Sequence, residues 1–207
     1  MANPEIKISD LDVIVIKGKD AETFLQGQIT NDIKLIKDEE KAIYAGYCSP
    51  KGRLIAFFLI IKVWDNYFLF CPSSISDGIS KKLSIYIMRS EVSLSHLSED
   101  ISYFIFHGES KEEKAFKNSG GTLPKSLMQT IKQSNTNNKS GLFSVTKLPG
   151  KNHRFFVLGN NKIVEGLYSK VYSKQGGLDS NSWHKSDIES KIPNIFAETQ
   201  DKFIPQS

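Results

Sequence analysis

The chain has 207 residues, of which 39% are hydrophobic and 24% are charged. This composition excludes a disordered or fibrous protein and suffices for one large domain or two small ones. The longest apolar run, from Leu54 to Ile61, is far shorter than the roughly 18 residues that cross a bilayer, so we expect no transmembrane helix and no membrane partner. No basic segment followed by an apolar one opens the sequence, which predicts a cytoplasmic protein.

The charge balance is mildly basic, with 27 Lys and Arg against 23 Asp and Glu, a net charge of +4. These residues are scattered rather than gathered into the patch or stripe that nucleic-acid-binding proteins present, so we do not expect direct nucleic-acid binding. Only Arg53, Arg89 and Arg154 carry guanidinium groups, which suit bidentate recognition of anions. Arg154 adjoins a strand-like run and is expected to be solvated or ion-paired.

The sequence contains no motif for metal binding or for nucleophilic catalysis. Cys48 and Cys71 are too few for a disulfide framework and too far apart for a Cys-x-x-Cys motif, and we expect both to be buried strand thiols. The four histidines lack metal-ligand spacing. No P-loop, Gly-x-Ser-x-Gly elbow or Gly-x-Gly-x-x-Gly segment is present. The sequence therefore predicts no metal site and no catalytic residue.

The first half of the chain predicts strands with two intervening helices. A β-branched strand at 11–16 is followed by a helix that Asp20 can cap, with helical spacing of apolar residues continuing to Ile29. Three further runs predict an antiparallel meander, because turn sequences separate them. These runs lie at 41–48, 53–63 and 67–71. A helix starting after Pro72 and a strand at 91–97 follow.

The second half repeats this mixture of strands and helices. We expect strands at 101–107, 142–148 and 154–158, and helices near 109–118, 161–174 and 183–190. The polar segment 129–140 predicts a surface loop, as does the stretch around Gly176 and Gly177. The overall fold class is therefore α+β, with mixed antiparallel sheets and packed helices, a first lobe at 1–98 and a second at 99–207.

Two polar features stand out against this framework. One is a cluster around the first helix, formed by Gln26, Gln28, Thr30, Asn31 and Asp32. The other is the basic turn Lys51-Gly52-Arg53. The pattern alone fits equally well a helix end with local capping followed by a hairpin turn, or a wall that binds a ligand.

Several sequence blocks resemble one known family, in the same order along nearly the whole chain. They include Phe24-Leu25-Gln26-Gly27-Gln28-Ile29-Thr30-Asn31-Asp32-Ile33 and Cys48-Ser49-Pro50-Lys51-Gly52-Arg53-Leu54. Later blocks are Leu83 to Val92, Trp183, Ile188 to Pro193 and Phe203 to Gln206. Together they resemble YgfZ-type folate-binding proteins, relatives of the glycine-cleavage aminomethyltransferase.

This resemblance implies the folate-binding-domain fold of the aminomethyltransferases. In the family, a Lys-Gly-Cys-Tyr-x-Gly-Gln-Glu signature and a carboxy-terminal β-barrel follow the last matching block, whereas this sequence stops at Ser207. We therefore expect an amino-terminal portion that lacks the barrel, and an apolar segment from Ile192 to Ser207 that needs a surface to cover.

The resemblance also implies a function. We expect a tetrahydrofolate-binding accessory protein for iron–sulfur cluster assembly or repair and for tRNA modification, with iron–sulfur proteins or their assembly machinery as partners. Aminomethyltransferases place an acidic pair on the strand after the glycine turn, where this chain has Ala56-Phe57-Phe58. Without a carboxylate there, we expect binding of folate and not its turnover.

The resemblance finally implies a set of folate-binding residues. Glu189 stands where the transferases have a glutamate that accepts hydrogen bonds from the pterin ring, although an exposed helix acid explains it equally well. The wall of the site would be formed by Gln26, Gln28, Asn31 and Asp32, and Lys51 or Arg53 would meet the anionic glutamate tail. The alternatives are a folate-dependent aminomethyltransferase, an RNA-binding module, and a fragment without activity of its own.

Overall fold

The computed structural model describes residues 10–36, 40–134, 142–172 and 179–205. The chain divides into two compact units, each built around its own sheet. The five-stranded unit comprises Asp10–Leu97 together with Pro193–Ser207, and the four-stranded unit contains Ser98–Ile192. The carboxy-terminal segment, which the sequence analysis placed with the second lobe, therefore groups with residues of the first.

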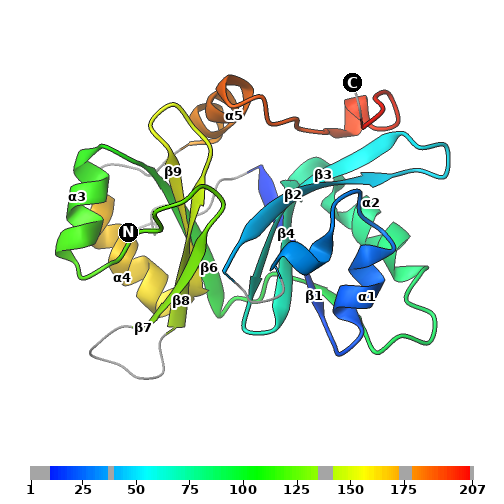
Figure 1. Ribbon diagram of the computed structural model, residues 1–207, viewed down its shortest axis with the longest axis horizontal. Helices are drawn as coiled ribbons and strands as arrows, with labels where there is room; N and C mark the ends of the chain where they lie inside the picture. The colour runs from blue at the N-terminus through cyan, green and yellow to red at the C-terminus, as the bar shows by residue number, and fades with distance from the viewer. Residues whose placement is uncertain (1–9, 37–39, 135–141, 173–178, 206–207) are drawn as a thin grey trace. The chain divides into compact units, whose positions relative to one another are not determined.

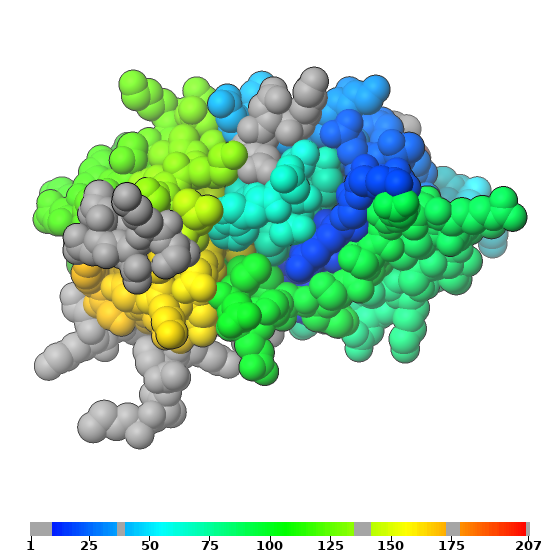
Figure 2. All heavy atoms as spheres, turned by 90° about the horizontal axis from the view of Figure 1, so that it is seen from below, coloured from blue at the N-terminus to red at the C-terminus, as the bar shows by residue number. Residues whose placement is uncertain are grey.

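In the five-stranded unit the strand order is β2-β3-β4-β1-β5, and every neighbouring pair is antiparallel. The strands are β1 (Leu11–Lys17), β2 (Ala42–Cys48), β3 (Leu54–Val63), β4 (Asn66–Pro72) and β5 (Ser93–His96). The predicted meander is confirmed as β2, β3 and β4. Figure 2 shows β1 in blue between β4 and the green segment that contains β5.

Two short helical segments and one longer helix complete this unit, namely α1 (Ala21–Gln26), η1 (Ile33–Ile36) and α2 (Ser73–Ser84). In α2, Ile75, Ile79 and Leu83 recur at helical spacing and are buried against the sheet. The first helix is shorter than predicted, since it ends at Gln26. The predicted cap by Asp20 is not made, because its carboxylate accepts the backbone N–H of Glu91 instead.

In the four-stranded unit the strand order is β6-β9-β8-β7, again antiparallel throughout. The strands are β6 (Ile101–His107), β7 (Thr130–Ser134), β8 (Leu142–Leu148) and β9 (Arg154–Asn160). The predicted surface loop at 129–140 is wrong for its first part, where β7 pairs with β8. Its composition is polar, but a neighbouring strand supplies backbone partners and Thr130 shares a hydrogen bond with Thr146.

Three helices belong to the four-stranded unit (Figure 1), namely α3 (Lys111–Asn118), α4 (Asn161–Tyr172) and α5 (Ser180–Glu189). Its core is rich in aromatic residues: Phe106 stacks on Phe155, and Phe116 meets Phe106 and Phe143. The predicted helices are confirmed within small shifts of their ends. The predicted loop at Gly176 and Gly177 lies outside the described residues.

The carboxy-terminal segment lies along a part of β3 that β4 does not reach. The pairing of β3 with β4 covers Leu59 to Val63. At the other end of β3, Leu54 donates its N–H to the carbonyl of Phe203, and its carbonyl accepts the N–H of Asp201. The amide of Gln200 donates to the carbonyl of Ile55 at 2.7 Å. These bonds satisfy polar backbone groups that would otherwise lie on an open sheet edge.

The expected α+β class with antiparallel sheets and packed helices is confirmed. In the parts of the chain that the structure describes, no helix is both long and apolar enough to cross a membrane. Cys71 is a buried strand thiol as expected, and burial raises its pKa to about 12. Cys48 is only half-buried.

Candidate functional site

Glu189 is the last residue of α5, a helix fixed at both ends. At its amino end, the Asp179 carboxylate accepts the N–H of Ser182 at 2.7 Å, an N-cap that lowers the pKa of this carboxyl group. Trp183 is buried on the inner side of the helix, while Glu189 is exposed. The helix therefore presents the Glu189 carboxylate at the surface from a firmly held backbone.

A single buried arginine ties α5 to the turn between β8 and β9. Arg154 has 0% of its surface exposed, and its Nη2 lies 2.7 Å from Oδ1 of Asp187. Its Nε donates to the carbonyl of Pro149 at 2.9 Å, and its guanidinium lies 4.3 Å from the centre of the Trp183 ring. The arginine is ion-paired, one of the two expected states, and it holds α5 and the 149–152 turn together.

Two hollows lie where this turn approaches the end of α5. One has a volume of about 440 Å³ and the other of about 530 Å³. Both are lined by Lys151 of the turn and by Glu189, so these two side chains stand between them. The first hollow adds His107, Lys185 and other polar residues, whereas the second adds Leu127, Pro149 and His153.

The electrostatics of the first hollow favour a neutral imidazole beside charged groups. Burial lowers the pKa of His107, and the Arg154 guanidinium lowers it further, against opposing effects of Glu112 and Glu189. Glu189 supplies carboxylate oxygens that accept hydrogen bonds, and the ammonium groups of Lys151 and Lys185 donate them. This arrangement can hold a ligand that presents N–H donors together with anionic or carbonyl acceptors.

The polar cluster of the five-stranded unit is largely engaged with its own backbone. Gln26 accepts the N–H of Ile33 at 2.9 Å, and the Asn31 amide donates to the carbonyl of Tyr44 at 2.9 Å. Asp32 accepts the N–H of Lys34 at 3.0 Å, in the first turn of η1. These bonds are of the local capping kind that the sequence allowed beside the ligand-binding interpretation.

Gln28 differs from its neighbours, because it lines a hollow of about 410 Å³ in the same unit. Other polar side chains of this hollow come from Tyr47, Cys48, Ser49, Lys82 and Tyr86. Burial raises the pKa of Tyr47, and the nearby Tyr86 raises it further. Burial likewise raises the pKa of the Cys48 thiol.

The basic turn and the strand after it complete the set of predicted residues. Lys51 and Arg53 are exposed, and Arg53 donates to the carbonyl of Lys202 at 3.3 Å. Ala56 is fully buried, and Phe57 stacks on Tyr44 with ring centres 5.9 Å apart. The beginning of β3 therefore presents no ionisable side chain.

The sequence patterns did not identify His107, Lys151 or Lys185 as site residues. Lys151 lies in the Pro149-Gly150-Lys151-Asn152 turn, which was recognised only as a turn, and Lys185 precedes Glu189 by one helical turn. That helical spacing is the signal that could have identified Lys185. Among the described side chains, no three His, Cys, Asp or Glu residues gather as metal ligands.

Sequence comparison shows which known proteins this chain resembles. No protein-family profile matches the chain. It is 26% identical over 204 residues to a tRNA-modifying protein YgfZ of Hamiltonella defensa, covering 98% of this chain and 57% of that one. A second protein of this name, from Colwellia psychrerythraea, is 21% identical over 97% of this chain and 58% of its own length.

A solved structure shares the fold. The glycine cleavage system aminomethyltransferase T of Bartonella henselae superposes with a TM-score of 0.69 and 14% identity, over 90% of this chain and 50% of that one. The chain thus spans 57% and 58% of the lengths of the two YgfZ relatives. The expected resemblance to the YgfZ and aminomethyltransferase proteins is confirmed.

Proposed function

From the similarity of this chain to YgfZ proteins over nearly its whole length, we propose that it is a tetrahydrofolate-binding accessory protein. It would serve iron–sulfur cluster assembly or repair and, through iron–sulfur enzymes, the modification of tRNA. The relatives that support this proposal are named for tRNA modification, and the shared fold is that of an aminomethyltransferase.

The observation that carries the proposal is the placement of Glu189. Its carboxylate stands at the end of α5 between two hollows and accompanies Lys151 in both. A pterin ring presents adjacent N–H donors on one edge, which two carboxylate oxygens can accept together. Hydrogen bonds to a charged acceptor contribute about 1.5–3 kcal/mol, enough to select such a ring.

The other proposed folate-binding residues differ in whether their side chains already form hydrogen bonds within the protein. Gln28 lines a hollow and has no side-chain hydrogen bond to a described residue, whereas Gln26, Asn31 and Asp32 support the loop that carries it. Lys51 and Arg53 are exposed and would meet the glutamate tail of folate. We propose direct contacts for Gln28, Lys51 and Arg53, and a positioning role for the other three.

The residues at the start of β3 support folate binding without turnover of the folate. Aminomethyl transfer needs an ionisable group that can assist proton movement near the folate nitrogen. The chain has a buried Ala56 and a stacked Phe57 at the positions in question. We therefore expect no tetrahydrofolate-dependent release of ammonia from an aminomethyl donor.

A titration of the 207-residue chain with tetrahydrofolate tests the proposal, with binding measured by calorimetry and by quenching of the fluorescence of Trp64 and Trp183. We expect saturable binding, weakened at least about tenfold by Glu189→Gln, because the amide accepts one hydrogen bond fewer and carries no charge. The matched control is Glu99→Gln, an exposed acid in the same unit that lines neither hollow. Absence of saturable binding by the unaltered chain would refute the proposed ligand.

The cellular part of the proposal needs a separate measurement. We expect the chain to raise the content of thiolated tRNA in cells that lack their own YgfZ protein, and Glu189→Gln to lower that rescue. A chain that binds RNA directly would instead show an RNA affinity that falls steeply with salt. Strong salt-dependent RNA binding with no folate binding would favour the RNA-binding alternative.

A further inference from the structure

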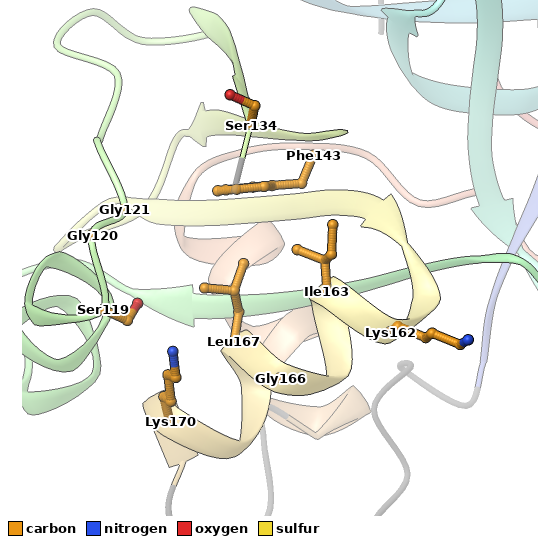
Figure 3. A pocket seen from close by; sticks show the side chains of 10 residues that line it. All are labelled: Ser119, Gly120, Gly121, Ser134, Phe143, Lys162, Ile163, Gly166, Leu167 and Lys170. Carbon is orange, nitrogen blue, oxygen red and sulfur yellow. The ribbon is translucent and has the colours of Figure 1, made fainter. Parts of the chain in front are cut away.

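A third hollow of the four-stranded unit lies on α4, away from Glu189, and has a volume of about 270 Å³ (Figure 3). Its floor is apolar and comes from Phe143 of β8 and from Ile163 and Leu167 of α4. Ser119 and Ser134 stand at its rim. Sites for small molecules combine such an apolar floor with a few polar groups, and this volume lies close to their lower size limit of about 300 Å³.

The cations of this hollow lie on one stripe of the helix. Lys162, Gly166 and Lys170 follow one another at intervals of four residues, so they share one face of α4. Neither ammonium group forms an ion pair with a described residue, and no carboxylate is among the residues that line the hollow. In Figure 3 the Lys170 side chain points toward Ser119 across the hollow, whereas Lys162 points away.

Gly166 is an unusual residue for this position. Glycine in a helix interior is less favourable than alanine, and it is retained where another group approaches the backbone closely. A side-chain carbon at Gly166 would meet no heavy atom within 4 Å. The packing of the protein therefore does not require glycine here, and its absent side chain leaves the hollow open above the helix backbone.

We propose that this hollow binds a small aromatic carboxylate, with its ring on Phe143, Ile163 and Leu167 and its anionic group at Lys170. The apolar floor accounts for the ring, and the Lys170 ammonium, which has no ion pair with a described residue and no acid beside it among the lining residues, accounts for the charge. The same chemistry is offered by a free aromatic acid and by the carboxy-terminal phenylalanine of a peptide.

The test uses 3-phenylpropionate as the free acid, its uncharged analogue 3-phenylpropanol, and a hexapeptide ending in phenylalanine with a free carboxylate. Binding to the whole chain is followed by amide chemical shifts in NMR and by calorimetry. We expect the acid to bind at least tenfold more tightly than the alcohol and to shift the amides around Gly166. The relative affinities of acid and peptide then assign the source of the ligand.

Substitutions separate a binding role from a structural one. Lys170→Met should weaken binding of the acid at least tenfold, while Lys114→Met, an exposed lysine of α3 outside the hollow, should change it less than twofold. Gly166→Ala should raise the unfolding temperature and weaken binding, and Gly166→Leu should abolish it. Equal binding of alcohol and acid, binding of none of the probes, or a lowered unfolding temperature of Gly166→Ala would overturn the proposal.

The result does not depend on the folate proposal. The inferred site shares no lining residue with the Glu189 hollows, so Glu189→Gln should leave binding of 3-phenylpropionate unchanged. Tetrahydrofolate at saturation should also leave it unchanged. Loss of acid binding in Glu189→Gln would place the ligand at the other site and refute the inference.

Discussion

The polar residues around the end of α1 and those around the end of α5 are chemically similar but have different hydrogen-bond partners. The side chains of Gln26, Asn31 and Asp32 form hydrogen bonds with backbone groups of their own unit. Lys151 and Glu189 line two hollows instead. Polar side chains are therefore available to a ligand where they do not already form hydrogen bonds with the protein backbone.

The largest effect should come from the buried ion pair that fixes the end of α5. Arg154→Met leaves Asp187 buried without its cation, which typically costs about 3–5 kcal/mol. Urea unfolding followed by circular dichroism measures the loss. The double variant with Asp187→Leu should recover much of it, because neither charge is then left unpaired. A loss below about 1 kcal/mol in Arg154→Met would contradict the assigned role.

The second test compares two glutamines of the same polar cluster. Gln26→Leu removes the acceptor of the Ile33 N–H and should cost about 1–2 kcal/mol of unfolding free energy. Gln28→Leu removes no side-chain bond to a described residue and should change stability by less than about 0.5 kcal/mol. Equal losses in the two variants would remove the distinction between an engaged and an available side chain.

The third test changes pH. The pKa of His107 is lower in the folded protein than in the unfolded chain, so the unfolded chain binds more protons between the two values. The stability contribution is present above the unfolded pKa of 6.5 and is lost as pH falls through the folded pKa. Urea midpoints between about pH 8 and pH 5 should show this loss, and His107→Gln should reduce it. If His107→Gln left the dependence of stability on pH unchanged, His107 would be excluded as the source of that dependence.

The smallest effect concerns the carboxy-terminal segment. Asp201→Asn weakens the hydrogen bond from Ser49, which spans 2.7 Å between exposed side chains, and should cost about 0.5 kcal/mol or less. Gln200→Ala removes a bond to the buried Ile55 and should cost more, about 1 kcal/mol. Urea unfolding of both variants gives the comparison. The reverse order would show that the exposed contact is the stronger one.

Local patterns predicted most of the fold. The apolar and aromatic runs of β2, β3 and β4 and the apolar spacing of α2 identify these elements without reference to distant residues. The strand β7 escaped prediction, because Lys132 and Gln133 are polar and the strand depends on its pairing with β8. The helix α1 was predicted too long, since the apolar spacing continues through Ile29 after the helix has ended.

The candidate site was predictable only in part. Glu189 was identified through a family resemblance, and its position on a helix follows from the local sequence. The pairing of Arg154 with Asp187 could not be predicted, because it joins β9 to α5 through tertiary packing. That Lys151 lines the hollows could not be predicted for the same reason. The ion pair of Arg154 and Asp187, together with the bond from Arg154 to Pro149, holds the turn that carries Lys151 next to α5.

The hydrogen bonds of Leu54 with Asp201 and Phe203 have a consequence for synthesis on the ribosome. The described part of the four-stranded unit runs from Ser98 to Ile192, whereas the five-stranded unit uses segments from both sides of it. During translation the inserted unit has all its residues before the edge of β3 can be closed. Until then, the start of β3 exposes unpaired backbone groups that invite association with other nascent chains.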